Sequence, residues 1–266
     1  MAFTALHTAA TGMQALSTKI DVIANNIANA DTPGYKASRA NFQDLLYQLY
    51  AQPGVQTSQD SWTPMGTQVG LGVALSNTQT IFKQGSAILT GEPLDAMIQG
   101  DGFFRIELPG GQTGYTRAGN FVRNANGELV LGNSFGYRLK DAPTIPSDVA
   151  IDKVGISSDG RITATKSDGT ITDLGQLQLA RFVNPAGLLQ NGANIFTSTQ
   201  ASGEPIEDVP GAQGMGLIQG GQLEQSTTEA VSELVELIKA QRVFQMNSQS
   251  IQAADESLRV VASLRQ

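Results

Sequence analysis

Apolar residues recur at alternating spacings of three and four through the start of the chain. The residues of this stripe are Leu6, Ala9, Met13, Leu16, Ile20, Ile23, Ile27 and Ala30. The repeat predicts one amphipathic helix over residues 3–30, roughly 40 Å long at about 1.5 Å per residue. Pro33 then excludes the helical conformation at Thr32, and Gly34 permits a turn, so we expect the helix to end there.

The end of the chain carries a second stripe with the same alternation. Its members are Leu237, Ala240, Phe244, Asn247, Ile251, Ala254, Leu258 and Val261, widened at the start by Val231, Leu234 and Ile238. This stripe predicts a second helix of roughly 50 Å. Asn247 is its polar member, and a single Asn in such a seam usually fixes register or partner. Long, narrow stripes of this kind favour pairing of helix with helix.

Short runs rich in β-branched and aromatic residues alternate with turn sequences in the middle of the chain. The turn sequences are Pro109-Gly110-Gly111, Asn126-Gly127, Asp159-Gly160 and Asp168-Gly169. Because these pairs suit the positive φ angles of tight hairpins, they predict antiparallel strands. The spacing of roughly ten residues favours a small sandwich or barrel and excludes a doubly wound sheet. The predicted fold class is therefore α+β, with two long terminal helices forming a coiled-coil inner layer around a Gly-rich, mostly antiparallel β domain.

The distribution of glycine suggests the domain boundaries. Of the 29 glycines, only Gly12 and Gly34 lie outside the stretch from Gly54 to Gly221. We expect an N-terminal helix over 1–35, a connector with an extended segment over 36–94, a β-rich domain over 95–221 and a C-terminal helix over 222–266.

The composition limits the kinds of catalytic and binding site that this chain can form. The chain has no Cys, and His7 is its one His, so thiolate or His-based metal sites and catalytic triads have almost no material. The net charge of −7 argues against a nucleic-acid partner. His7, the Gly100-Asp101-Gly102 run and the Asp-Gly turns are better explained as a helix flank and turns than as sites. We therefore predict no catalytic, cofactor-binding or metal-binding residue.

The start of the chain has neither the basic region nor the apolar run of a secretory signal, and no apolar stretch reaches 18 residues. We expect no cleaved signal peptide and no membrane insertion.

Three segments resemble the bacterial flagellar rod and hook proteins. They are residues 23–36, 99–104 and 232–248. The first resembles the signature of the family, and its motif residues are Asn25, Asn26, Asn29, Thr32, Gly34 and Tyr35. Within the family the chain looks most like the subunits of the distal rod, on residues 42–47, 52–54 and 69–73.

The resemblance implies a structural subunit, not an enzyme. Such subunits polymerise into a hollow tube that transmits motor torque to the hook, and the flagellar type III apparatus exports them without a cleaved signal peptide. The implied location is the basal body, from periplasm to outer membrane. The implied partners are further copies of the chain, the proximal rod, the hook, the surrounding rings and the export apparatus, with no cofactor, no nucleic acid and no membrane insertion. The expected self-assembly interface comprises Leu6, Met13, Leu16, Ile20, Ile23, Ile27, Leu234, Leu237, Phe244, Asn247, Ile251 and Leu258.

Two alternatives stay open at this point. One is a proximal rod or hook-like axial subunit. The other is a secreted carbohydrate-binding or hydrolytic β domain, which would need a cleft with clustered carboxylates. Asp95, Asp101 and Glu107 are instead spread over a turn and a strand.

The segment 47–66 carries Tyr47, Tyr50, Pro53 and the single Trp, Trp62. Its Pro, Gly, Ser and Gln content is typical of a solvated linker. Rigid aromatic rings, however, supply contact area at little entropic cost. We predict that this segment packs between neighbouring subunits and stiffens the polymer.

Overall fold

A computed structural model describes residues 2–54, 56–58, 61–62, 64–166 and 168–263. The chain divides into two compact units, each considered by itself. We call one the helical unit, made of Met1–Ala28, Ser38–Gln79 and Ala230–Gln266, and the other the β unit, made of Asn29–Ala37 and Thr80–Glu229.

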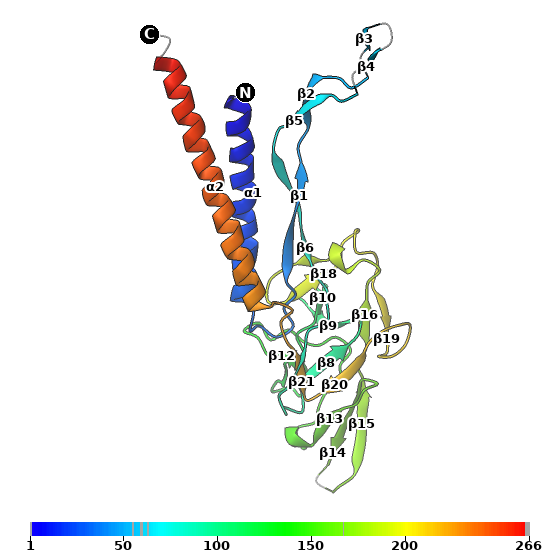
Figure 1. Cartoon of the computed structure of the whole chain (residues 1–266). Coiled ribbons are helices and arrows are strands. Elements are labelled where there is room, and N and C mark those ends of the chain that lie inside the picture. Colours follow the sequence, from blue (N-terminus) through cyan, green and yellow to red (C-terminus); the bar gives the residue numbers. More distant parts are fainter. Residues whose placement is uncertain (1, 55, 59–60, 63, 167, 264–266) are drawn as a thin grey trace. The chain divides into compact units, whose positions relative to one another are not determined.

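Two long helices dominate the helical unit, as their apolar stripes predicted. Helix α1 spans Ala2–Ala28 and helix α2 spans Ala230–Ser263. They lie side by side and run in opposite directions (Figure 1). The stripes therefore predicted both the existence of the helices and their pairing.

Contacts along the pair keep one register. Asn26 on α1 donates a hydrogen bond to Glu233 on α2 at 3.2 Å, and further along the pair Gly12 lies against Asn247. Both helices advance by the same fourteen residues between these two contacts, as a constant antiparallel register requires. Between them Lys19 forms an ion pair of 3.0 Å with Glu236.

Paired strands complete the helical unit (Figure 1). Strand β1 (Ser38–Asp44) pairs with β6 (Val73–Thr80), whose last residue belongs to the β unit. Beyond them, β2 (Tyr47–Ala51) pairs with β5 (Thr67–Gly70), and the short β3 (Gln56–Ser58) pairs with β4 (Ser61–Trp62). We call residues 45–72 the arm. The expected extended segment is thus a β ribbon.

The β unit is built on a six-stranded antiparallel sheet. Its order is β17 (Leu189–Gln190), β18 (Ile195–Thr197), β10 (Thr113–Thr116), β9 (Phe103–Glu107), β16 (Leu179–Arg181) and β19 (Ile206–Asp208). Smaller antiparallel sheets join β7 (Ala87–Leu89) with β21 (Gln222–Glu224), β8 (Ala96–Gln99) with β20 (Leu217–Gly220), and β11 (Phe121–Arg123) with β12 (Leu129–Leu131). The last sheet is β13 (Val154–Ile156), β14 (Arg161–Thr165) and β15 (Ile171–Gln176), and two 3₁₀ turns span Ile151–Lys153 and Pro185–Gly187.

The predicted hairpins are confirmed. Asn126-Gly127 connects β11 to β12, and Asp159-Gly160 connects β13 to β14. Gly127 and Gly160 have φ of 82° and 81°, in the left-handed region that glycine adopts without strain. The strand pairs flanking Pro109-Gly110-Gly111 and Asp168-Gly169 are antiparallel as well.

Strand β9 separates two apolar clusters because neighbouring side chains point to opposite faces of a sheet. Phe104 and Ile106 enter the main core, whereas Phe103 joins a second cluster with Tyr115, Ala180, Phe182, Leu188 and Phe196. Rings of the second cluster meet edge to face, with Tyr115 and Phe182 centroids 4.7 Å apart. We expected a small sandwich or barrel. The structure instead has an open six-stranded sheet with an apolar cluster on each face.

The C-terminal helix begins later than the boundary expected at residue 222. Residues 222–224 form strand β21 on β7, and α2 starts at Ala230. The backbone of 222–224 is committed to a ladder, so it cannot also supply helical hydrogen bonds.

Candidate assembly surfaces

Most of the predicted interface residues line the helix pair within one chain. Ile23 is buried, with 5% of its surface exposed. Half-buried members on α1 are Leu6, Met13, Leu16, Ile20 and Ile27, and on α2 they are Leu237, Asn247, Ile251 and Leu258. The apolar stripes of α1 and α2 thus pack against each other within one chain. Their role in contacts between copies of the chain stays a prediction.

Leu234 and Phe244 stand apart because both are exposed. Leu234 belongs to an apolar ridge near the start of α2 that also contains Val231, Val235 and Ile238. Their i, i+3, i+4 and i+7 spacing places them on one helix face. All are exposed, Val231 at 72%, so no described part of this chain covers the ridge. Contiguous exposed apolar surface of this kind typically marks an interaction site.

Asn26 fixes the end of α1 inside the helical unit. Its side chain is buried, donates to Ser38 O at 2.8 Å and accepts from Ser38 N–H at 3.0 Å. Its amide also reaches Glu233 on α2. One side chain therefore joins α1, β1 and α2, while its neighbour Asn25 is exposed.

The rest of the family motif forms a turn in the β unit. Thr32 Oγ1 donates to Asn29 Oδ1 at 3.2 Å, and Tyr35 N–H donates to Thr32 O. Gly34 has φ of 72°, and a Cβ there would lie 2.7 Å from Ala118 N. A larger residue would both strain and displace this turn.

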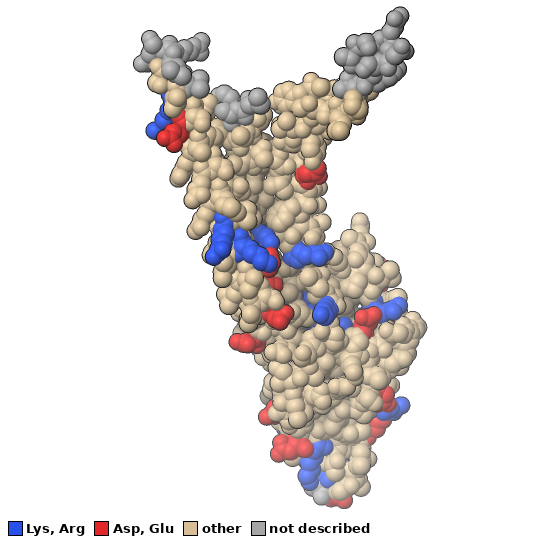
Figure 2. All heavy atoms as spheres, in the orientation of Figure 1, with Lys and Arg blue, Asp and Glu red and all other residues tan. Residues whose placement is uncertain are grey.

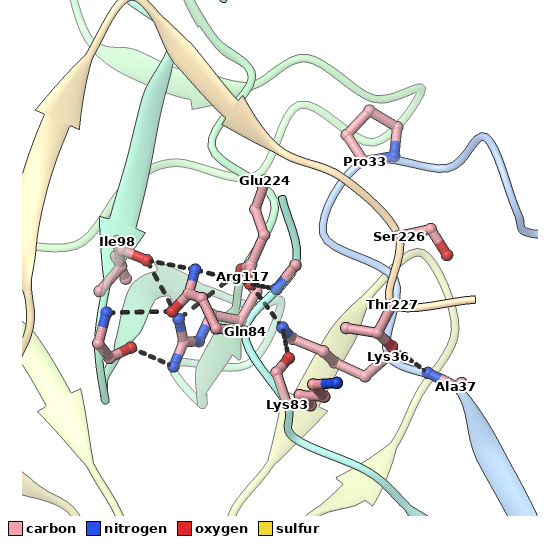
Figure 3. A network of polar contacts seen from close by, with 12 residues as sticks. Pro33, Lys36, Ala37, Lys83, Gln84, Ile98, Arg117, Glu224, Ser226 and Thr227 are labelled. Atoms are coloured by element: carbon pink, nitrogen blue, oxygen red, sulfur yellow. Dashed lines mark hydrogen bonds and ion pairs between the residues drawn. The ribbon is translucent and has the colours of Figure 1, made fainter. Parts of the chain in front are cut away.

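Lys36, which follows the motif, enters a buried ionic network at the end of β21 (Figure 3). Lys36 Nζ lies 2.7 Å from Glu224 Oε1, and both side chains are at most 1% exposed. Arg117 approaches the other carboxylate oxygen at 3.7 Å and donates to Gly100 O at 2.8 Å. Gln84 Nε2 and Gly85 N–H also donate to Glu224 Oε1, at 2.9 and 2.8 Å. We call Lys36, Arg117 and Glu224 the buried triad.

Burial shifts the pKa values of both cations of the triad, Lys36 and Arg117. Burial lowers the pKa of Lys36 below its ordinary value, although the Glu224 carboxylate opposes this shift. Burial also lowers the pKa of Arg117, again against the effect of Glu224. The sequence interpretation missed this triad. Its residues are far apart in the chain, and the one local signal is a carboxylate at Glu224 between an apolar Leu223 and a polar turn.

The arm exposes apolar side chains along its length. Leu46 is 83% exposed and Met65 80%, and the predicted stiffening residues Tyr47 and Tyr50 are about half exposed. Tyr47 packs near Gly70 across the ribbon, and the Tyr50 hydroxyl donates to Gln48 Oε1 at 3.3 Å. Pro53 is also exposed, whereas the side chain of Trp62 lies outside the described part of the chain. A hydrogen bond with the Asp44 carboxylate and the negative charge of that carboxylate raise the pKa of Tyr47.

Charged side chains are sparse on the arm and on the middle of α2. Residues 45–82 contain one charged residue, Asp60, and residues 243–254 of α2 contain none. Figure 2 shows a band of Lys and Arg part-way along the helices, with mostly uncharged surface between this band and a small charged group near the end of α2. Uncharged surface costs less to bury than charged surface, which suits a contact area between proteins.

Known proteins match this chain over almost its whole length. The family model for flagella basal body rod proteins matches residues 6–36, the flagellar hook protein FlgE/F/G D1 domain matches 97–164, and the flagellar basal body rod FlgEFG protein C-terminal region matches 219–264. The flagellar basal-body rod protein FlgG of Caulobacter vibrioides is 44% identical over 98% of this chain and 99% of its own. FlgG of Agrobacterium fabrum is 44% identical over 97% and 98%, and FlgG of Borreliella burgdorferi 40% over 98% of both chains. The chain belongs to the flagellar basal-body rod protein FlgG family.

Membership of the FlgG family makes the chain a structural subunit of the flagellar distal rod and places it in the flagellar basal body. It favours the rod over a secreted carbohydrate-binding or hydrolytic domain. Neither described helix is long and apolar enough to cross a membrane. Among the described residues, no three His, Asp or Glu side chains are grouped as a metal ion would need.

Proposed function

We propose that copies of this FlgG-family chain polymerise into the hollow drive shaft of the distal rod, which transmits motor torque to the hook. The observation that carries the proposal is the apolar ridge, which remains exposed after α1 and α2 have paired. Burying one such aliphatic side chain contributes on the order of 2 kcal/mol. Repeated in every copy through a heterologous contact that does not close, this contribution favours an open helical polymer.

The wider assembly follows from the same proposal. Besides itself, the chain contacts the proximal rod, the hook and the surrounding basal-body rings, from periplasm to outer membrane. The flagellar export apparatus carries it without a cleaved signal peptide. Its role is mechanical, with no catalytic, cofactor, metal or nucleic-acid chemistry and no membrane insertion.

The arm has a separate part in the proposal. A two-stranded ribbon is marginal in water when it stands alone. Its exposed tyrosines and aliphatic residues gain order and burial by packing between neighbouring subunits, and this packing stiffens the polymer. The predicted group Tyr47, Tyr50, Pro53 and Trp62 belongs to this contact.

Ile238→Asp in the ridge tests polymerisation. A carboxylate buried without a partner in a subunit contact is expensive, so this variant should remain monomeric by electron microscopy and sedimentation. Circular dichroism should still show a folded β unit. Ile23→Asp and Leu237→Asp should also abolish polymers, but by opening the helix pair.

Ile171→Asp is the matched control, because Ile171 is an exposed Ile on β15 of the β unit. It should polymerise like the wild type. Normal polymers from Ile238→Asp would remove the ridge from the interface, and absence of polymers from the wild-type protein would overturn the proposed function.

A further inference from the structure

The buried triad lies where the chain enters and leaves the β unit. Four chain connections join the two units, after residues 28, 37, 79 and 229. Lys36 immediately precedes the connection at 37, Gln84 and Gly85 follow the one at 79, and Glu224 precedes the one at 229. The Glu224 carboxylate therefore joins two connecting segments, one containing Lys36 and the other containing Gln84 and Gly85, to its own.

Backbone contacts tie the same segments together. Gly34 N–H donates to Glu224 O at 2.7 Å, a second contact with the segment 29–37, which is joined to the helical unit at both of its ends. The others are Thr227 N–H to Tyr35 O at 3.1 Å, Ala37 N–H to Thr227 Oγ1 at 2.9 Å, Gln225 N–H to Ser86 O at 2.8 Å and Ile81 N–H to Ala37 O at 2.8 Å. All four connections are thus cross-linked inside the β unit, around one carboxylate.

A buried ion pair is a poor choice for stability alone. Desolvation of the two charges offsets much of their attraction, and apolar residues of similar volume often stabilise as well or better. An ionic network instead fixes geometry, because each partner is satisfied in one arrangement only. Glu224 Oε1 accepts from Lys36, Gln84 and Gly85, so shifting any one connecting segment breaks a bond to a buried charge.

We propose that the buried triad is a mechanical clamp, which holds the connecting segments at fixed spacing so that load passes between them through side-chain contacts. This role rests on the proposed function, since a clamp matters where subunits carry torque. Lys36 and Arg117 are positioning residues that act through Glu224.

Lys36→Met and Glu224→Gln test the clamp in the full chain. Lys36→Met leaves the Glu224–Arg117 pair in place, so it is the milder change and serves if Glu224→Gln fails to fold. Both should yield polymers with the wild-type helical lattice and a loss of bending stiffness, measured from thermal curvature in electron micrographs. In the monomer, amide exchange at residues 34–37, 83–85 and 225–227 should speed up together.

Ile162→Ala provides the matched control. Ile162 is fully buried in the main core, so the substitution destabilises the β unit without touching the triad. Its polymers should keep their stiffness even when its unfolding temperature falls as far as that of Lys36→Met. Equal softening by Ile162→Ala, or wild-type stiffness in Lys36→Met polymers, would refute the clamp. Absence of polymers from the wild type would count against the proposed function instead.

Discussion

The helical unit and the β unit differ in how completely they bury their apolar side chains. In the β unit, residues such as Phe104, Ile106 and Leu129 are almost completely buried. In the helical unit, most of the stripe is half-buried, and the ridge and the arm remain open. The β unit therefore has a finished core, whereas the helical unit needs neighbours to complete its own. This difference fits the proposed polymerisation, in which neighbouring copies cover the open surfaces of the helical unit.

Hydrogen exchange on the dilute monomer should show the largest contrast. We expect fast exchange along residues 1–30 and 228–266 and strong protection in β9, β10 and β16, because local opening costs little where few apolar contacts are lost. In the polymer both regions should be protected. Strong protection of both helices in the monomer would show that the helical unit is complete without neighbours.

Deleting residues 52–66 of the arm should have the next largest effect. Export and both terminal helices should remain intact, while the polymers become bendable or unstable because the arm no longer packs between subunits. Bending stiffness from electron micrographs measures this change. Deletion polymers as stiff as the wild type would reduce the arm to a linker.

The two units also differ in how far the sequence predicts them. The apolar stripes predicted α1 and α2 because the residues on one helix face recur every three or four positions and can be recognised within a short stretch of sequence. The Asn-Gly and Asp-Gly pairs placed β11–β12 and β13–β14 for the same reason. Local signals fail for the buried triad, whose Lys36 and Glu224 are 188 residues apart.

The arm and Asn26 show the same limit. The strands of the arm lack a clear alternation, since both faces are exposed, so the sequence predicted an extended segment but not its pairing into a ribbon. Asn26 was singled out by the family motif, but its bonds to Ser38 and Glu233 depend on a chain reversal and a helix pairing that no local pattern encodes.

Acid should act on the helical unit through two glutamates with opposite shifts. Hydrogen bonds from Lys239 and Lys19 hold the pKa of Glu236 at about 2, and burial raises the pKa of Glu233 above its ordinary value of 4.5. As pH falls from neutrality to 4.5, protonation of Glu233 should stabilise the folded helices. As pH falls further through about 2, the contribution of Glu236 should be lost.

Thermal loss of helical circular dichroism in the assembled protein, followed against pH, measures both limbs. Glu233→Gln should flatten the limb above 4.5 and leave the lower limb, and Glu236→Gln should do the reverse, so each variant controls for the other. An unchanged acid limb in Glu236→Gln would show that its ion pairs with Lys19 and Lys239 do not contribute in solution.

Gly12→Ala should have the smallest effect, and it asks how closely the helix pair is packed. Alanine favours the helix by about 1 kcal/mol over glycine. The new Cβ would lie 3.0 Å from Asn247 Nδ2, the far end of a flexible side chain, so the Asn247 amide must give by a few tenths of an ångström. We expect these terms to nearly cancel in the thermal dissociation of the polymer. In an Asn247→Ala background the contact is gone, and Gly12→Ala should then show its full stabilisation. An equal effect in both backgrounds would mean that Gly12 and Asn247 are not coupled, and that Asn247 does not set the register at this crossing.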